Sequence, residues 1–178
     1  LDCRDKVVKL TIGPKNKYFK DKTDSDVIEE IINTYSLDAN IESTNVTHKG
    51  LVQFNCTDWD FILSRLEVNG KICITNDGAI EVKAPSLDGD AAMSLTYGKD
   101  IMEFDAAMDA RTQYQAVKAS SWDPVNFDIL ETDATDPAIN GNGNITPADL
   151  ASVIGLDSLN LNHTGMLPQQ ELQAWAVA

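Results

Sequence analysis

The residues whose types and spacing come nearest to a metal-binding motif lie between positions 140 and 149. If Gly143 is the sharp-turn glycine at position six of a calcium loop, oxygen-bearing side chains follow at the spacing such loops use, and a carboxylate falls at position twelve. The candidate ligands are Asn140, Asn142, Asn144 and Asp149.

The same segment has a simpler interpretation. Position one of the loop would be Ala138, which offers no side-chain oxygen, and the loop holds a single carboxylate, whereas calcium affinity rises with ligand charge. An Asn-Gly turn that leads into a helix capped by Thr146 explains the same residues. We therefore predict neither a bound metal nor a cofactor, and keep a calcium-binding adhesion module as an alternative.

Residue combinations typical of catalysis are scarce. His48 and His163 are the two histidines, and they lie far apart in the sequence, so a zinc site is not expected. No serine sits in a Gly-x-Ser-x-Gly elbow, and no glycine-rich phosphate loop is found. Asp58 and Asp60 are two apart on a predicted helix, so they point to different faces, and we expect them to stabilise the helix N-terminus. We predict a protein that is not an enzyme, with a carboxylate hydrolase as a weaker alternative.

Charge is distributed unevenly along the 178 residues, whose net charge is −14. Residues 1–22 hold seven basic residues against three acids, a balance of +4, which leaves −18 for the remainder. A surface this acidic repels phosphate backbones, so we expect no nucleic-acid partner. The basic start is expected to form a solvated strand face or a subunit contact.

Compartment and membrane association follow from simple features. Cys3, Cys56 and Cys73 are odd in number and widely spaced, which predicts free, buried thiols in a reducing compartment. The sequence begins at Leu1 without a signal-peptide pattern, so we expect a piece of a longer protein that carries no secretory signal. Because no apolar stretch is long enough to cross a bilayer, we expect no membrane anchoring by this fragment.

The first half of the chain predicts a strand, two helices and a hairpin. The strand covers 7–12, and apolar spacing with Thr23 and Asp26 as capping residues predicts a helix over 24–36. A second helix begins after Thr57, carries an apolar stripe and ends at Asn69-Gly70. Alternating residues on both sides of 76–78 predict a hairpin over 72–82 with one apolar face.

The second half is predicted to be richer in strands. The loop at 84–90 is the expected domain boundary, which divides the chain into an α+β region, 1–84, and a second β-rich domain, 91–178. Four strands are expected, over 93–97, 101–108, 113–122 and 125–130. A mobile linker over 132–144 and helices over 147–154 and 167–178 complete the prediction of an α+β fold with antiparallel, barrel-like sheets and short amphipathic helices.

Several ordered strings in the sequence resemble the VgrG (Rhs-element Vgr) family. The most specific part is a Val-Gln pair followed by Thr-Asp-Trp-Asp-Phe, an arginine and Asn-Gly, in that order. The strings in the first half are Lys9–Gly13, Tyr18-Phe19, Thr23–Ile28, Val46–Gln53 and Thr57–Arg65. Those in the second half are Leu95–Gly98, Phe104, Met108–Arg111, Ala116–Ala119, Trp122-Asp123, Leu167 and Glu171–Ala176. The likeness spans nearly the whole chain and departs from the family at 139–144.

The resemblance implies a structural role in a contractile injection machine. The family forms trimeric, phage-tail-like hubs that dock on a hexameric Hcp-like tube in the baseplate of type VI secretion systems and help deliver effectors. It implies assembly in the cytoplasm, followed by secretion or injection into target cells without a signal peptide. The hub of a contractile phage tail is the alternative within the same class.

Overall fold

The computed structural model describes residues 3–86, 89–135 and 144–178, and its fold is α+β, as predicted. Up to residue 83 the elements are η1 (Lys6–Thr11), β1 (Lys15–Phe19), β2 (Lys22–Thr23), α1 (Asp24–Asn33), β3 (Asp38–Ile41), β4 (Thr47–His48), β5 (Leu51–Cys56), α2 (Asp58–Val68), β6 (Ile72–Asn76) and β7 (Ala79–Lys83). After residue 116 they are β8 (Val117–Asp123), β9 (Asp128–Asp133), α3 (Pro147–Ile154), β10 (Leu159–His163) and α4 (Gln169–Val177).

The strands form four small sheets, with orders β1-β5, β2-β4, β3-β7-β6 and β10-β8-β9. All pairs are antiparallel except β3 with β7 and β10 with β8, which run parallel. Through the described parts of the chain these sheets stay open, so the barrel-like curvature expected from the sequence does not close into a barrel.

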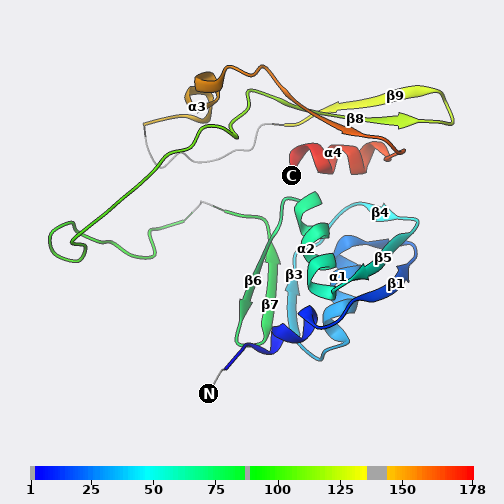
Figure 1. Cartoon of the computed structure of the whole chain (residues 1–178), viewed down its shortest axis with the longest axis horizontal. Helices are drawn as coiled ribbons and strands as arrows, with labels where there is room; N and C mark the ends of the chain where they lie inside the picture. The colour runs from blue at the N-terminus through cyan, green and yellow to red at the C-terminus, as the bar shows by residue number, and fades with distance from the viewer. Residues whose placement is uncertain (1–2, 87–88, 136–143) are drawn as a thin grey trace.

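The larger hydrophobic core lies within residues 7–82, where helices α1 and α2 and the 3₁₀ helix η1 pack with the sheets (Figure 1). Ile28, Ile32 and Ile62 are among its fully buried side chains. The rings of Phe19 and Phe61 stack with their centroids 5.9 Å apart. Burial of several branched side chains, each worth about 1.5–3 kcal/mol, offsets the entropy of ordering this half of the chain.

Helix starts follow the sequence predictions closely. The side chain of Thr23 accepts a hydrogen bond from the backbone of Asp26, whose carboxylate accepts one from the backbone of Thr23, and this capping box starts α1. Thr57 caps α2, which ends at Asn69 before Gly70, whose φ of +59° is in the left-handed region. Helix α1 ends at Asn33, three residues earlier than predicted.

The predicted strand at residues 7–12 is wrong, because residues 6–11 form η1. The carboxylate of Asp5 accepts a hydrogen bond from the backbone of Val7 at 2.8 Å and caps this helix. Val7 and Leu10, the two residues of η1 that are buried, are three apart, which is the period of a 3₁₀ helix. This β-branched apolar run forms a helical turn. Its buried side chains recur every three residues, whereas those of a half-buried strand would recur every two.

The β6–β7 hairpin is confirmed, but its apolar residues do not share one face. The turn holds Asp77 and Gly78 at φ of +49° and +84°, as a two-residue hairpin turn requires. Ile80 and Val82 face the core. Ile72 and Ile74 pair with Lys83 and Glu81 and lie on the opposite, exposed face.

Two of the four strands predicted for the second half are wrong. Residues 93–97 and 101–108 form an extended chain whose one bridge joins Tyr97 to Ile101. The other two predictions correspond to β8 and β9, with start points later than expected, and the turn at Asp123-Pro124 is confirmed. Strand β10, which the sequence analysis missed, pairs in parallel with β8.

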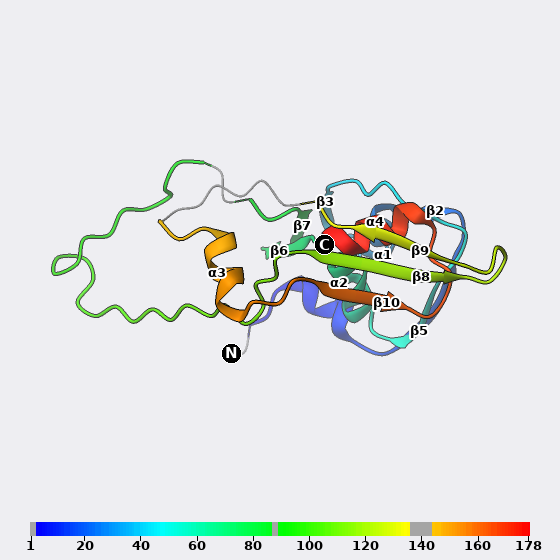
Figure 2. The ribbon, with the colours of Figure 1, turned by 90° about the horizontal axis from the view of Figure 1, so that it is seen from above.

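The smaller core joins α4 to the inner face of the β10-β8-β9 sheet, as Figures 1 and 2 show. Leu172 and Ala176 are one turn apart on α4 and pack with Ala119 of β8. The outer face of the same sheet is open in Figure 2. Helix α4 therefore lies between this sheet and the first half of the chain.

The domain boundary at residues 84–90 stays a prediction, as does the mobility of 132–144, most of which lies outside the described residues. None of the helices in the described ranges combines the length and apolar character that a bilayer crossing needs.

Candidate functional site

A buried cluster of charged side chains joins α1, β4, α2 and α4. Arg65 donates two hydrogen bonds to Asp24, from Nε to Oδ1 at 2.6 Å and from Nη2 to Oδ2 at 3.1 Å. Asn69 donates to the same carboxylate at 2.9 Å, and Nε2 of His48 lies 3.0 Å from it. Glu171 completes the cluster, with its Oε1 3.5 Å from Nδ1 of His48.

The cluster is electrostatically balanced. Burial raises the pKa of Asp24, but the hydrogen bonds from His48 and Arg65 outweigh it and hold that pKa well below its usual range. Hydrogen bonds to Asp24 and then to Glu171 raise the pKa of His48 to about 9. The hydrogen bond from His48 also lowers the pKa of Glu171. At neutral pH two anions therefore face two cations, which is the arrangement that buried charges need.

The protonation state of His48 determines whether each ring nitrogen donates or accepts a hydrogen bond. As an imidazolium it donates from both nitrogens, so its two carboxylate neighbours are hydrogen-bond acceptors. The 3.3 Å contact between His48 Nε2 and Arg65 Nη2 is then an approach of two donors. Because both nitrogens are occupied and the side chain is only 6% exposed, His48 is placed to hold elements together.

A second polar cluster lies beneath the β1–β5 ribbon. Asp58 is buried at the start of α2 and accepts hydrogen bonds from Lys15 at 2.7 Å, from Gln53 at 2.8 Å and from the hydroxyl of Tyr35. Burial raises the pKa of Asp58, and the hydrogen bonds from Lys15, Tyr35 and Gln53 lower it further than burial raises it. Asp58 lies in the first turn of α2, as predicted, and in addition ties β1, β5 and the segment just after α1 to that turn.

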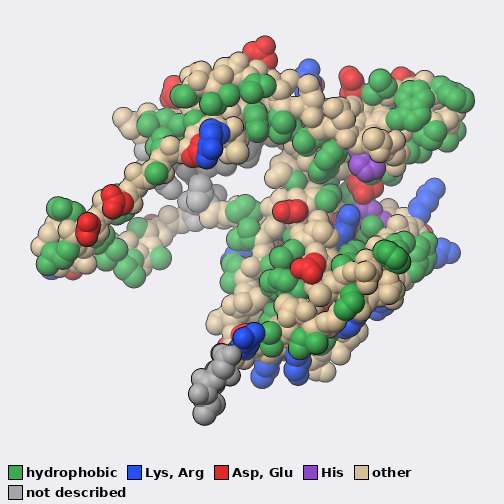
Figure 3. All heavy atoms as spheres, in the orientation of Figure 1, with side chains coloured by type: hydrophobic (Ala, Val, Ile, Leu, Met, Phe, Trp, Pro, Cys, Tyr) green, Lys and Arg blue, Asp and Glu red, His purple; other side chains and the backbone are tan. Residues whose placement is uncertain are grey.

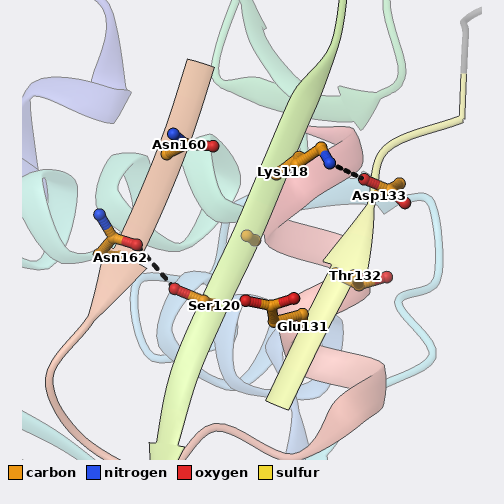
Figure 4. A pocket seen from close by; sticks show the side chains of 8 residues that line it. Lys118, Ser120, Glu131, Thr132, Asp133, Asn160 and Asn162 are labelled. Atoms are coloured by element: carbon orange, nitrogen blue, oxygen red, sulfur yellow. Dashed lines mark hydrogen bonds and ion pairs between the residues drawn. The ribbon is translucent and has the colours of Figure 1, made fainter. Parts of the chain in front are cut away.

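The outer face of the β10-β8-β9 sheet holds a shallow polar pocket of about 340 Å³ (Figure 4). Ser120 donates to Asn162 across β8 and β10 at 2.7 Å, and Lys118 lies 3.7 Å from Asp133 across β8 and β9. Glu131 lies beside Ser120 in register. This face is polar at the level of these residues and becomes apolar toward the hairpin end, where Trp122 and Ile129 pair.

Exposed large apolar side chains form several groups on the described surface, and two of the three groups that follow are prominent in Figure 3. The first is the β8–β9 hairpin tip, which we define as Trp122, Val125, Phe127 and Ile129. The second is the arm, which we define as residues 89–109 and whose exposed apolar side chains are Met93, Leu95, Tyr97, Met102, Phe104 and Met108. The third is the ribbon face, formed by Tyr18, Val52 and Phe54 of strands β1 and β5. Large contiguous patches of exposed apolar side chains mark interaction sites for proteins, membranes or ligands.

The structure describes two of the four sequence-predicted metal candidates, Asn144 and Asp149. Asn140 and Asn142 lie outside the described residues, and Asn144 is exposed. The carboxylate of Asp149 accepts hydrogen bonds from the backbone and hydroxyl of Thr146, in a capping box that starts α3. Within 3–86, 89–135 and 144–178, no group of three or more His, Cys, Asp or Glu side chains could hold a metal ion.

The cysteine and histidine predictions have mixed outcomes. All three cysteines are free, but Cys3 is exposed and the other two are half-buried, so full burial was wrong. His48 and His163 are in separate surroundings: His48 is in the buried cluster, and His163 packs edge-on against Trp175.

Sequence reasoning missed the Asp24 cluster, because its members come from four elements with no short motif between them. One signal in the sequence could have revealed it. Asp24 and Arg65 are charged residues that fall on the apolar, core-facing sides of α1 and α2. Charged residues at such positions are seldom buried unless they are paired.

Comparisons with known proteins identify a family and two solved tail-protein structures with a similar fold. A sequence profile of the family described as "Alg8 N-terminal domain" matches residues 1–178. The crystal structure of the 43 kDa tail protein of prophage MuSo2 from Shewanella oneidensis is similar, with a TM-score of 0.61 and 12% identity over 97% of this chain. The tail protein from Neisseria meningitidis MC58 is similar with a TM-score of 0.56 and 12% identity over 96% of this chain. This chain spans 50% of the length of each. A search of curated proteins found no match.

Proposed function

The chain belongs to the Alg8 N-terminal domain family, and we propose that it is a structural part of a phage-tail-like contractile injection machine, without enzymatic activity. The observation that carries the proposal is the fold that 97% of the chain shares with a phage tail protein. Fold alone does not determine function, so the surfaces must support the same role.

The exposed apolar surfaces support a role in assembly. The hairpin tip, the arm and the ribbon face project large side chains that the chain itself leaves uncovered. Subunit contacts in stable assemblies are built from such aromatic and aliphatic centres with polar rims. An isolated soluble monomer has no physical reason to carry three of them.

The buried titratable groups support a structural role as well. His48, Asp24 and Asp58 are the groups with the burial and charge partners that could tune them for acid–base work. Each is already held by several partners inside the protein, at distances from 2.6 to 3.1 Å in the case of Asp24. Such groups fix the positions of helices and strands and leave no oxygen or nitrogen directed at a substrate.

In its finer form, the proposal is a VgrG-like trimeric hub of a type VI secretion system. Such a hub would contact a hexameric Hcp-like tube and baseplate proteins, and would help deliver effectors after assembly in the cytoplasm. The sequence strings around Gln53, Asp58–Phe61 and Arg65 support this form, because Gln53, Asp58 and Arg65 are also the residues that hold the two buried clusters together. The hub of a contractile phage tail remains the second candidate.

The test is a binding experiment with the full-length protein. Its native mass and its co-purification with the tube protein encoded beside it would be measured. We expect a trimer that captures the tube hexamer, and a tail-type tube gene beside it would favour the phage-tail form. A full-length protein that stays monomeric and ignores the tube, or that hydrolyses a substrate with loss on Asp24→Asn, would contradict the proposal.

A further inference from the structure

The arm leaves the body of the protein and covers none of it. Every residue from 89 to 109 is exposed, except the half-buried Ile101. Its six large apolar side chains are between 53% and 78% exposed. Loops of this length without secondary structure are uncommon inside compact domains and are usually functional when they occur.

The sequence of the arm has the pattern of two strands, which pair with none of the strands that the structure describes. Met93, Leu95 and Tyr97 alternate with small or polar residues, as in a half-buried strand. A turn closed by hydrogen bonds from Asp100 and Ile101 to the carbonyl of Thr96 separates this limb from the next, which carries Met102 and Phe104. An alternating segment with exposed apolar side chains is suited to pairing with the edge of another sheet.

The arm is acidic as well as apolar. Residues 89–109 contain five acids and one lysine, a balance of −4. Glu103 and Asp105, on either side of Phe104, are exposed. The surface that receives the arm should therefore combine an apolar centre with basic residues at its rim.

The β1–β5 ribbon has that composition. It is a two-stranded sheet, so among the described elements neither of its outer edges has a strand partner. Its exposed face carries Tyr18, Val52 and Phe54. Because Phe19 pairs with Leu51, Lys20 and Lys49 lie together at one end of the ribbon, both exposed.

An arm cannot reach the ribbon of its own chain. In both ribbon views the arm and the β1–β5 ribbon lie toward opposite ends of the long axis (Figures 1 and 2). A contact between two different surfaces at opposite ends is head-to-tail, and repetition of such a contact closes a ring or extends a filament.

We propose that the arm of one copy docks on the β1–β5 ribbon of a second copy, with Phe104 and its neighbours against the ribbon face and Glu103 and Asp105 near Lys20 and Lys49. This inference rests on the proposed assembly function and specifies which surfaces join its subunits. The acidic arm and the basic ribbon end give the contact its direction, because two arms or two ribbons would repel each other.

A charge-swap experiment tests the contact. One double variant, Lys20→Glu with Lys49→Glu, reverses the ribbon, and another, Glu103→Lys with Asp105→Lys, reverses the arm. Self-association of each variant, measured by analytical ultracentrifugation, should weaken by at least about tenfold relative to the unchanged chain. An equimolar mixture should recover association, because the unchanged arm of the first variant fits the unchanged ribbon of the second and the reversed arm fits the reversed ribbon. Native mass spectrometry should show complexes that contain both variants.

Two controls make the result interpretable. Asp38→Lys with Asp157→Lys changes the net charge as the arm variant does but lies on neither surface, so it should associate like the unchanged chain. The melting temperature of the arm variant should match that of the unchanged chain, because Glu103 and Asp105 are both exposed.

An unchanged chain that is monomeric at every concentration would overturn the inference. So would variants that associate normally or a mixture that recovers nothing. If the full-length protein still captures its tube while these outcomes hold, the proposed function stands and the arm contact alone is wrong.

Discussion

Oε1 of Glu171 lies 3.5 Å from Nδ1 of His48, so a carboxylate of the last helix closes a buried cluster whose other members come from residues 24–69. The contact ties α4, and with it the β10-β8-β9 sheet, to the first half of the chain. Because the cluster carries two positive and two negative charges, removal of any one member leaves a net charge in the interior.

Arg65→Ala should destabilise the protein by about 3–5 kcal/mol, because it leaves the buried Asp24 carboxylate without its two-bond partner. Urea denaturation followed by circular dichroism measures the change. The matched control is Arg111→Ala, which removes an arginine that also holds an aspartate, Asp109, but in full exposure, and it should change stability little. Equal effects of the two substitutions would contradict the importance of the cluster.

Stability should fall as the pH rises from about 6.5 to 9. The pKa of His48 is raised from its ordinary 6.5 to about 9 in the folded protein, so the unfolded chain loses this proton first. The contribution of the charged imidazole is complete below pH 6.5 and is lost toward pH 9, at a cost of roughly 2–3 kcal/mol. His48→Gln should flatten this part of the pH profile of the unfolding free energy. His163→Gln, which alters the other histidine, should leave the slope in place.

Leu172→Ala should cost about 2–5 kcal/mol, because Leu172 is fully buried between α4 and the β10-β8-β9 sheet. Val177→Ala, on the same helix but half exposed, should cost far less. Thermal unfolding followed by the fluorescence of Trp175 and the other tryptophans reports the difference. Similar midpoints for the two variants would show that α4 does not cover the sheet.

Calcium should leave the melting temperature unchanged, because the carboxylate of Asp149 is engaged in capping α3. Thr146→Ala removes the other half of that capping box and should destabilise α3 by about 1 kcal/mol, with or without calcium. Differential scanning calorimetry in calcium and in a chelator tests both statements. A rise in melting temperature with calcium that Asp149→Asn abolishes would restore the calcium-loop alternative.

Local signals predicted the helices and tight turns well. Thr23, Thr57 and Thr146 were identified as helix caps because capping depends on residues three positions apart. The turn at residues 76–78 was also predicted from a local signal, because residues that tolerate positive φ are recognisable in a sequence.

Tertiary context decided what the sequence could not. Residues 6–11 have strand-forming composition but form a 3₁₀ helix, because Asp5 caps them and Val7 and Leu10 are buried together. Met93–Tyr97 alternates like a strand, yet within the described ranges its one bridge joins Tyr97 to Ile101. The Asp24 cluster could not be predicted from the sequence, because His48, Arg65 and Glu171 come together around Asp24 only when four elements pack.

The two parallel strand pairs set the order in which the protein can form as it leaves the ribosome. Strand β3 cannot pair until β7 has been synthesised. Both strands lie before residue 84, so the first half of the chain can fold early. Strand β8 pairs with β9 at once, whereas β10 and then α4 arrive only at residues 159–177. Until residues 159–177 have been synthesised, the apolar underside of the β8–β9 hairpin therefore stays open to solvent and to chaperones.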